Sequence, residues 1–146
     1  MQITRETDYA IRCILYLAGK DGNSAVVGEI SRDQAVPRTF AAKIMQKLHK
    51  AGLVVSTRGV KGGYTLNRTP EEITLLEIVE AIEGPISINI CVIDKNSCER
   101  QPHCNVHPVW VEIRDLLVEK LRSYTLDKLI NNNPPSGDNT TGRRRA

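Results

Sequence analysis

Residues 91–107 gather most of the side chains in this chain that can bind soft metals. The segment reads CVIDKNSCERQPHCNVH and holds three of the four cysteines and two of the three histidines. Six residues separate Cys91 from Cys98, five separate Cys98 from Cys104, and two separate Cys104 from His107. Thiolates and imidazoles bind zinc and iron–sulfur clusters, and thiols also oxidise to disulfides. The segment therefore predicts a metal site, an Fe–S site or a thiol switch.

The spacing of these ligands favours an Fe–S cluster over zinc. Zinc fingers and ribbons pair their ligands about two to four residues apart, and the gaps here are wider. Three thiolates at wide, nearly even intervals on one loop can surround an Fe–S cluster whose fourth ligand comes from elsewhere. Zinc, and a disulfide with a spare thiol, stay open as alternatives on spacing alone.

The start of the chain bears on the redox environment of these thiols. The first residues, MQITRETDYA, are polar and charged, and no apolar run typical of a secretory signal follows them. No stretch approaches the roughly 18 apolar residues of a membrane helix. We therefore expect a cytoplasmic protein, in which thiols stay reduced and clustered cysteines indicate metal or redox chemistry more often than structural disulfides.

Charge is divided unevenly between the two halves of the 146-residue chain. Residues 1–70 contain 11 Lys and Arg against 5 Asp and Glu, whereas residues 71–130 contain 6 against 11. A basic half joined to an acidic half indicates that the basic half meets a polyanion.

The elements expected in residues 1–84 form a winged helix-turn-helix DNA-binding domain of the mainly α class. Apolar spacing predicts helices over 5–19, 28–34 and 37–51. It gives the third helix an apolar stripe of Phe40, Ile44 and Leu48, with Ala41 beside them. Residues 53–55 and 64–66 are expected to be strands joined by the glycine-rich turn RGVKGG, which makes a two-stranded wing. Thr74 is expected to cap a further helix over 75–82.

This order of elements suits the recognition of double-stranded DNA. The third helix of such a domain lies in the major groove, with its first residues at base edges and later ones at phosphates. The residues expected in these roles are Arg38, Thr39, Lys43, Gln46 and Lys47. Arg58 and Lys61 lie at the tip of the wing, where a basic side chain can enter the minor groove.

The rest of the chain is expected to carry regulation and assembly. Residues 85–107 are the predicted cluster-binding loop, and residues 108–130 are a predicted dimerisation helix. The apolar stripe of that helix is Trp110, Ile113, Leu117, Leu121 and Tyr124. Residues 131–146, NNNPPSGDNTTGRRRA, are expected to be a disordered tail. Cys13, which lies in the first helix, is expected to face the core.

From about Thr4 to Tyr124 the chain resembles the IscR/NsrR/CymR family of dimeric winged-helix transcription regulators. TRETDYAIRCILYLA is similar to the family's first helix, and VVGEISRDQAVPRTFAAKIMQKLHKAGLV is similar to its helix-turn-helix. The most specific segment is STRGVKGGYTLNRTPEEITLLEIVEAIEG, which contains an RGxxGGY wing and the helix that follows it.

The resemblance implies a homodimer that binds a pseudo-palindromic operator and holds an Fe–S cluster through three loop cysteines, here Cys91, Cys98 and Cys104. IscR-like members hold a 2Fe–2S cluster with a histidine after the third cysteine, a position that His107 matches. NsrR-like members hold a nitric-oxide-sensitive 4Fe–4S cluster, and their fourth ligand resembles Asp8 of the partner subunit. This chain has six rather than five residues in the first gap, which leaves the cluster type open. CymR-like members lack the cysteines.

We therefore expect a transcriptional repressor or activator whose operator affinity follows iron–sulfur status, redox state or nitric oxide. The alternative is a thiol/disulfide- or zinc-based regulator with no Fe–S cluster. An enzyme is not expected, because no histidine–acid pair is recognisable around Cys13 and the loop cysteines lack a nucleophile motif.

Overall fold

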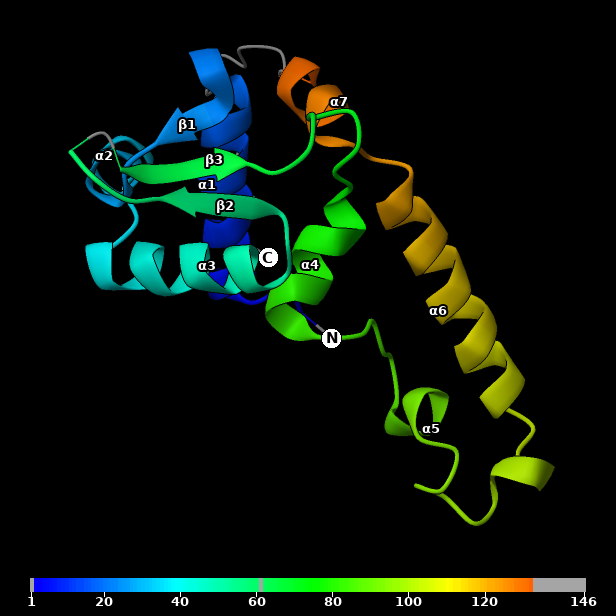
Figure 1. Ribbon diagram of the computed structural model, residues 1–146. Coiled ribbons are helices and arrows are strands. Elements are labelled where there is room, and N and C mark those ends of the chain that lie inside the picture. Colours follow the sequence, from blue (N-terminus) through cyan, green and yellow to red (C-terminus); the bar gives the residue numbers. More distant parts are fainter. Residues whose placement is uncertain (1, 61, 133–146) are drawn as a thin grey trace, which may run out of the picture.

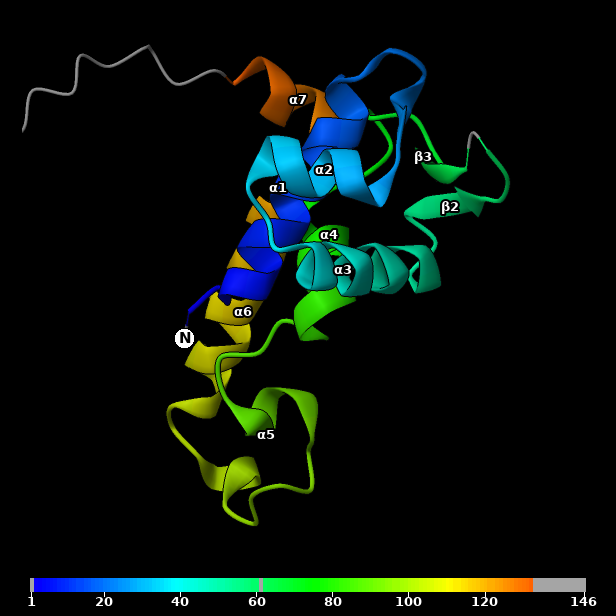
Figure 2. The ribbon, with the colours of Figure 1, turned by 90° about the vertical axis from the view of Figure 1, so that its left-hand side faces the viewer.

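The structure, a computed structural model that describes residues 2–60 and 62–132, consists of a winged-helix body and a projecting arm (Figure 1). The body contains three short strands and the helices α1 (Arg5–Gly19), α2 (Val27–Gln34), α3 (Arg38–Lys50), α4 (Leu75–Glu83) and α7 (Leu126–Asn131). The arm contains α5 (Ile90–Ile93), the 3-10 turn η2 (Gln101–His103) and α6 (His107–Arg122). It points away from the sheet in both ribbon views (Figure 2). The predicted mainly α fold class is confirmed.

A core of aliphatic side chains holds the body together. Thr4 caps α1 by accepting a hydrogen bond from the Thr7 N–H (3.3 Å), which fixes the start of the helix where it was predicted. Cys13 is fully buried, as expected, and burial raises the pKa of its thiol to about 11. None of the helices in the described part of the chain is long and apolar enough to cross a membrane.

The helix-turn-helix is formed by α2, α3 and the short turn between them. Ala35 adopts the left-handed conformation (φ 51°) that ends α2. Ser31 holds the turn, because its hydroxyl donates to the Val36 carbonyl (2.6 Å) and its own carbonyl accepts from the Val36 N–H (3.1 Å). The predicted bounds of both helices are confirmed to within one residue.

Phe40, one residue of the predicted apolar stripe of α3, is not buried. The residues that face the core are Ala41, Ile44, Met45 and Leu48, all fully buried, whereas the Phe40 side chain is 49% exposed. Positions 40 and 41 both fit a four-residue repeat with the later apolar residues. The packing of α1 and α2 onto α3 selects position 41 and turns Phe40 outward.

The wing has one strand more than the sequence predicts. β2 (Val54–Thr57) and β3 (Gly63–Leu66) form the expected antiparallel hairpin, and β1 (Ser24–Ala25) pairs with the other edge of β3. A strand of two residues is too short to show alternation, so no pattern indicates it. Gly63 permits this pairing, because a Cβ there would lie 2.6 Å from the Ala25 carbonyl oxygen.

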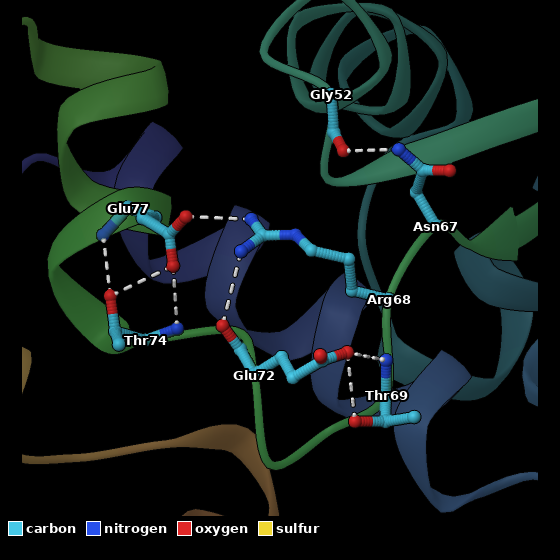
Figure 3. A network of polar contacts seen from close by, with 7 residues as sticks. All are labelled: Gly52, Asn67, Arg68, Thr69, Glu72, Thr74 and Glu77. Carbon is cyan, nitrogen blue, oxygen red and sulfur yellow. Dashed lines mark hydrogen bonds and ion pairs between the residues drawn. The ribbon is translucent and has the colours of Figure 1, made fainter.

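A polar network joins the end of the wing to the start of α4 (Figure 3). Thr74 and Glu77 form a reciprocal capping box, which confirms Thr74 as the cap. The Arg68 guanidinium bonds Glu77 Oε1 (2.6 Å) and the Glu72 carbonyl (3.1 Å). Asn67 Nδ2 donates to the Gly52 carbonyl (2.9 Å). The residues after β3 are therefore bonded to α4 and to Gly52, which follows the end of α3.

The segment predicted as one dimerisation helix, 108–130, is divided in the structure. α6 ends at Arg122, and the chain then returns to the body and begins α7 at Leu126. The Leu75 N–H donates to the Tyr124 carbonyl (2.8 Å), and the Leu126 N–H donates to the Ile73 carbonyl (2.9 Å). These long-range bonds impose a break that no proline or glycine marks in the sequence.

α7 belongs to the winged-helix body, because Leu126 is fully buried in its core and α7 packs against α1. Asn131, the first residue of the predicted disordered tail, is the last residue of α7. Residues 133–146 of that tail lie outside the described residues.

Candidate nucleic-acid interface and cluster site

The exposed face of α3 carries all five residues that were expected to read DNA. Its buried positions face the core, so Arg38, Thr39, Lys43, Gln46 and Lys47 lie exposed on the outer side of the helix. Lys50 is exposed on the same helix and adds a cation that the sequence-based prediction had not included. The helix thus presents a predominantly basic surface with two uncharged hydrogen-bonding side chains, Thr39 and Gln46.

Two of these side chains lie next to neighbouring helices. Lys47 Nζ forms an ion pair with Glu6 Oε1 of α1 (2.6 Å). The guanidinium of Arg38 lies close to Gly28 of α2, where a Cβ would be 3.9 Å from its central carbon. Glu6 therefore neutralises one cation of the basic surface in the absence of DNA.

Phe40 lies in the first turn of α3, on the side that faces α1. Its ring meets the Tyr9 ring edge-on, with centroids 6.2 Å apart and an interplanar angle of 70°. The Arg12 guanidinium stacks over the Tyr9 ring at 5.4 Å and forms an ion pair with Asp8 (2.6 Å). An exposed aromatic ring is thus held in place by partners on α1.

The wing tip exposes the predicted arginine. Arg58 and the neighbouring Gly59 and Val60 are all exposed beyond the end of β2. The turn is closed by the Gly62 N–H bonding to the Gly59 carbonyl (2.8 Å), and a Cβ on Gly62 would lie 2.7 Å from the Thr57 carbonyl oxygen. Glycine is therefore required at position 62 by close backbone approach. The other predicted wing residue, Lys61, lies outside the described residues.

The cysteine loop brings two of its four predicted ligands together. His107 Nδ1 lies 3.4 Å from the Cys91 sulfur, which joins the first turn of α6 to α5. Gln101 contacts the other ring nitrogen of His107 (3.0 Å) and so orients the imidazole. Cys98 is exposed and Cys104 is half-buried. Among the residues that the structure describes, no three His, Cys, Asp or Glu side chains are close enough together to hold a metal ion.

The donor chemistry of the loop nevertheless fits an Fe–S cluster. Cys91, Cys98 and Cys104 are all free thiols, and all three have solvent access. Fe–S clusters are held by cysteine thiolates, with histidine as a recurrent substitute. Because metal binding orders its own ligands, a loop of this composition can close on a cluster around the contact between Cys91 and His107.

Asp8, the other predicted fourth ligand, lies on a different part of the surface. It is exposed in the first turn of α1, and its described partner is Arg12. No described contact joins it to the cysteine loop of the same chain.

The arm carries an apolar face that residues 2–60 and 62–132 leave uncovered. α6 has no buried residue, although it packs on one side against α4 and α5. Val109, Ile113 and Leu116 are 45%, 40% and 59% exposed, respectively. The predicted stripe residues Trp110, Leu117 and Leu121 are half-buried.

Glu83, the last residue of α4, links the arm to α1 and was not singled out by the sequence. Its carboxylate accepts hydrogen bonds from the Thr4 N–H (3.1 Å) and from the hydroxyls of Thr4 and Thr7. These hydroxyl donors lower the pKa of Glu83. Gly84 follows with φ 82° and begins the segment that leads to the cysteine loop.

Comparisons with known proteins agree with this architecture. A profile of the Rrf2 family, described as iron-dependent transcriptional regulators, matches residues 3–132. The HTH-type transcriptional regulator IscR of Pectobacterium atrosepticum is 29% identical over 133 residues, which is 90% of this chain and 80% of that protein.

Two solved structures share the fold over most of the chain. CymR, the global cysteine regulator of B. subtilis, aligns with a TM-score of 0.73 at 29% identity and covers 92% of this chain and 99% of that chain. T. potens IscR aligns with a TM-score of 0.69 at 25% identity, and the alignment covers 90% of this chain and 87% of that chain. The chain therefore belongs to the Rrf2 family and is a winged-helix transcriptional regulator.

Proposed function

We propose that this regulator binds a pseudo-palindromic operator as a homodimer and that an Fe–S cluster on the cysteine loop controls its affinity for DNA. Cys91, Cys98 and Cys104 are the proposed cysteine ligands. The proposed fourth ligand is His107 in a 2Fe–2S site or Asp8 of the partner subunit in a 4Fe–4S site. The family description and the IscR relatives support iron-dependent regulation.

The observation that carries this proposal is the contact between Cys91 and His107. These residues are 16 positions apart, yet their donor atoms lie 3.4 Å apart at the base of a loop with two further free thiols. The contact also favours His107 over Asp8 as the fourth ligand. When bound, the cluster would supply a redox-active centre that reacts with oxidants and nitric oxide.

The proposed dimer interface is the uncovered face of α6. Two copies of this helix placed side by side would cover Val109, Ile113 and Leu116, which are exposed in the described part of a single chain. The two copies of α3 would then read half-sites about one helical turn, roughly 34–36 Å, apart or a multiple of it. A small change in the angle between the arm and the body would change this separation.

Two connections tie the arm to the DNA-reading body. At one end Glu83 holds the start of α1, whose Glu6 in turn holds Lys47 of α3. At the other end the Ile73–Leu75 segment bonds the chain after α6, and Arg68 joins α4 to the wing. A change in the loop can therefore reach both α3 and the wing. A coupling of about 1–3 kcal/mol would change operator affinity roughly 5- to 150-fold.

The test is to purify the full chain without oxygen, with full cluster supply, and to measure iron, acid-labile sulfide and the absorption spectrum together. About two iron atoms per chain supports the site with His107, and about four supports the site with Asp8 of the partner subunit. Absence of iron would refute the cluster proposal.

Single substitutions distinguish the proposed cluster ligands from other residues of the loop. We expect Cys98→Ala to lose iron and sulfide while its far-UV circular dichroism is unchanged. His107→Ala should lose or alter the cluster spectrum, whereas His103→Ala, a matched exposed histidine on the same loop, should not. Operator affinity should then stop depending on cluster loading in Cys98→Ala. A variant that keeps its iron and its response would show that Cys98 is not a ligand.

The second candidate is a thiol- or zinc-based regulator that uses the same cysteines. The exposure of the free Cys98 thiol favours it. It predicts colourless protein that contains either one zinc ion per chain or a disulfide after oxidation. Zinc analysis and the mass of tryptic peptides that span residues 91–107 distinguish these two forms.

A further inference from the structure

We propose that Phe40 is a specificity-determining residue that contacts the C5-methyl group of a thymine in the major groove of the operator. The inference deepens the proposed function and rests on its operator-binding part. It does not depend on the identity of the cluster.

The first argument is the position of the Phe40 ring. It lies in the first turn of α3, the part of a recognition helix that reaches base edges. Arg38 and Thr39, which precede it, are exposed, as is Lys43 one turn later. Half of a large aromatic side chain therefore lies on the surface that is expected to meet DNA.

The second argument is that this ring has an aromatic partner on α1 although it is half exposed. Tyr9 meets it edge-on at 6.2 Å, and the Arg12 guanidinium covers the Tyr9 ring at 5.4 Å. Edge-to-face aromatic pairs and cation–π contacts both fix ring orientation. A side chain that is oriented before binding loses less entropy when its ligand arrives, as a base-reading residue should.

The third argument is the chemistry around the ring. Phe40 lines a groove on the surface of α3 together with Glu6, Lys43, Gln46, Lys47 and Lys50. A basic rim suits phosphates rather than an apolar protein partner. Within the major groove the C5-methyl group of thymine is the apolar feature of the base edges, and Phe is among the side chains that contact it. The apolar ring of Phe40 is therefore suited to contact the apolar methyl group of a thymine.

The test is a methyl-deletion cycle with the full-length protein. An operator is first selected in vitro with the wild-type chain, and each thymine is then replaced in turn by deoxyuridine, which lacks only the methyl group. We expect one thymine position per half-site at which the replacement weakens binding about fourfold, the factor for one buried methyl group. In Phe40→Ala the same replacement should have no effect.

Two controls separate this role from others. Lys50→Gln should weaken binding equally to the operator with thymine and to the operator with deoxyuridine at the sensitive position, because a phosphate contact does not depend on the methyl group. Phe40→Leu should retain part of the methyl effect. If Phe40→Ala does not fold by circular dichroism, 5-iododeoxyuridine at the sensitive position of the wild-type complex should crosslink to a peptide that contains Phe40.

The outcomes distinguish the two proposals. A wild-type protein that selects no DNA sequence refutes operator binding, and Phe40 with it. A selected operator with no methyl-sensitive position refutes the Phe40 assignment alone. So does a methyl effect that survives in Phe40→Ala, or a crosslink that falls on another residue.

Discussion

Glu77 joins the wing to the rest of the regulator, and its replacement offers a quantitative test of the network in Figure 3. One carboxylate oxygen accepts from the Thr74 N–H (2.9 Å) and the Thr74 hydroxyl (3.0 Å). The other accepts from Arg68 Nη2 (2.6 Å). Glu77→Ala therefore removes two interactions in one step: the Glu77 side-chain contribution to the capping box and the ion pair with Arg68.

The expected loss of stability is the sum of a hydrogen-bond contribution and an ion-pair contribution. In Glu77→Ala the Thr74 side chain still caps α4, but the Thr74 N–H loses its acceptor, and one such hydrogen bond contributes about 1 kcal/mol. The ion pair is partly solvated, with side-chain exposures of 37% for Arg68 and 36% for Glu77. Its contribution is therefore discounted to about 0.5 kcal/mol. We expect Glu77→Ala to lower the free energy of unfolding by about 1.5 kcal/mol, the sum of the lost hydrogen bond and the lost ion pair. Glu77→Gln, whose amide oxygen can still accept from Thr74, should lose about a third of that.

The assay is urea unfolding followed by circular dichroism, with Glu80→Ala as the matched control at an exposed position of the same helix. A double-mutant cycle with Arg68→Ala should return a coupling of about 0.5 kcal/mol. Operator affinity should also fall in Glu77→Ala, since Arg68 directly follows the wing. If Glu77→Ala is no less stable than Glu80→Ala, the network does not stabilise the body and the reasoning is refuted.

Three further predictions test other contacts. Glu6→Gln frees Lys47 for DNA, so operator binding should tighten and the slope of log affinity against log salt should steepen by about 0.9; an unchanged slope would mean that Lys47 meets no phosphate. Leu126→Ala should lower the free energy of unfolding in urea by about 2–5 kcal/mol, because the side chain is fully buried between α7 and the core; a loss below about 1 kcal/mol would show that α7 is not docked in solution. Because the folded-state pKa of Glu83 is below its ordinary value of 4.5, its contribution to stability is present above that pH and is lost as pH falls below it. Glu83→Gln should flatten that part of a stability–pH profile relative to wild type, and identical profiles would exclude the Glu83 contacts.

Local pattern was sufficient for the helix-turn-helix and the wing hairpin. The bounds of α1, α2 and α3 follow from apolar spacing, from the Thr4 cap and from the turn after Gln34, all of which act within a few residues of the chain. The same reasoning failed at Phe40. Two neighbouring positions satisfied the helical repeat equally well, and only the packing of α1 and α2 decided which one was buried.

Long-range pairing decided what the pattern left undetermined. The break after α6 is imposed by backbone bonds between the Ile73–Leu75 segment and residues around Thr125, which are far apart in the sequence. β1 exists because Gly63 lets a second strand approach β3. Neither feature leaves a local signal, because in each case the partner lies about 40 or more residues away.

By itself the sequence determined the chemistry available to this regulator. The residue types and their order predict a basic winged helix, three thiols and a histidine on one loop, and an apolar helix after it. The tertiary structure alone decided that His107 meets Cys91, that Phe40 faces outward on a support from Tyr9, and that α7 docks back on the body. The physical reason is that side-chain chemistry is a property of each residue, whereas burial and contact depend on which distant elements cover it.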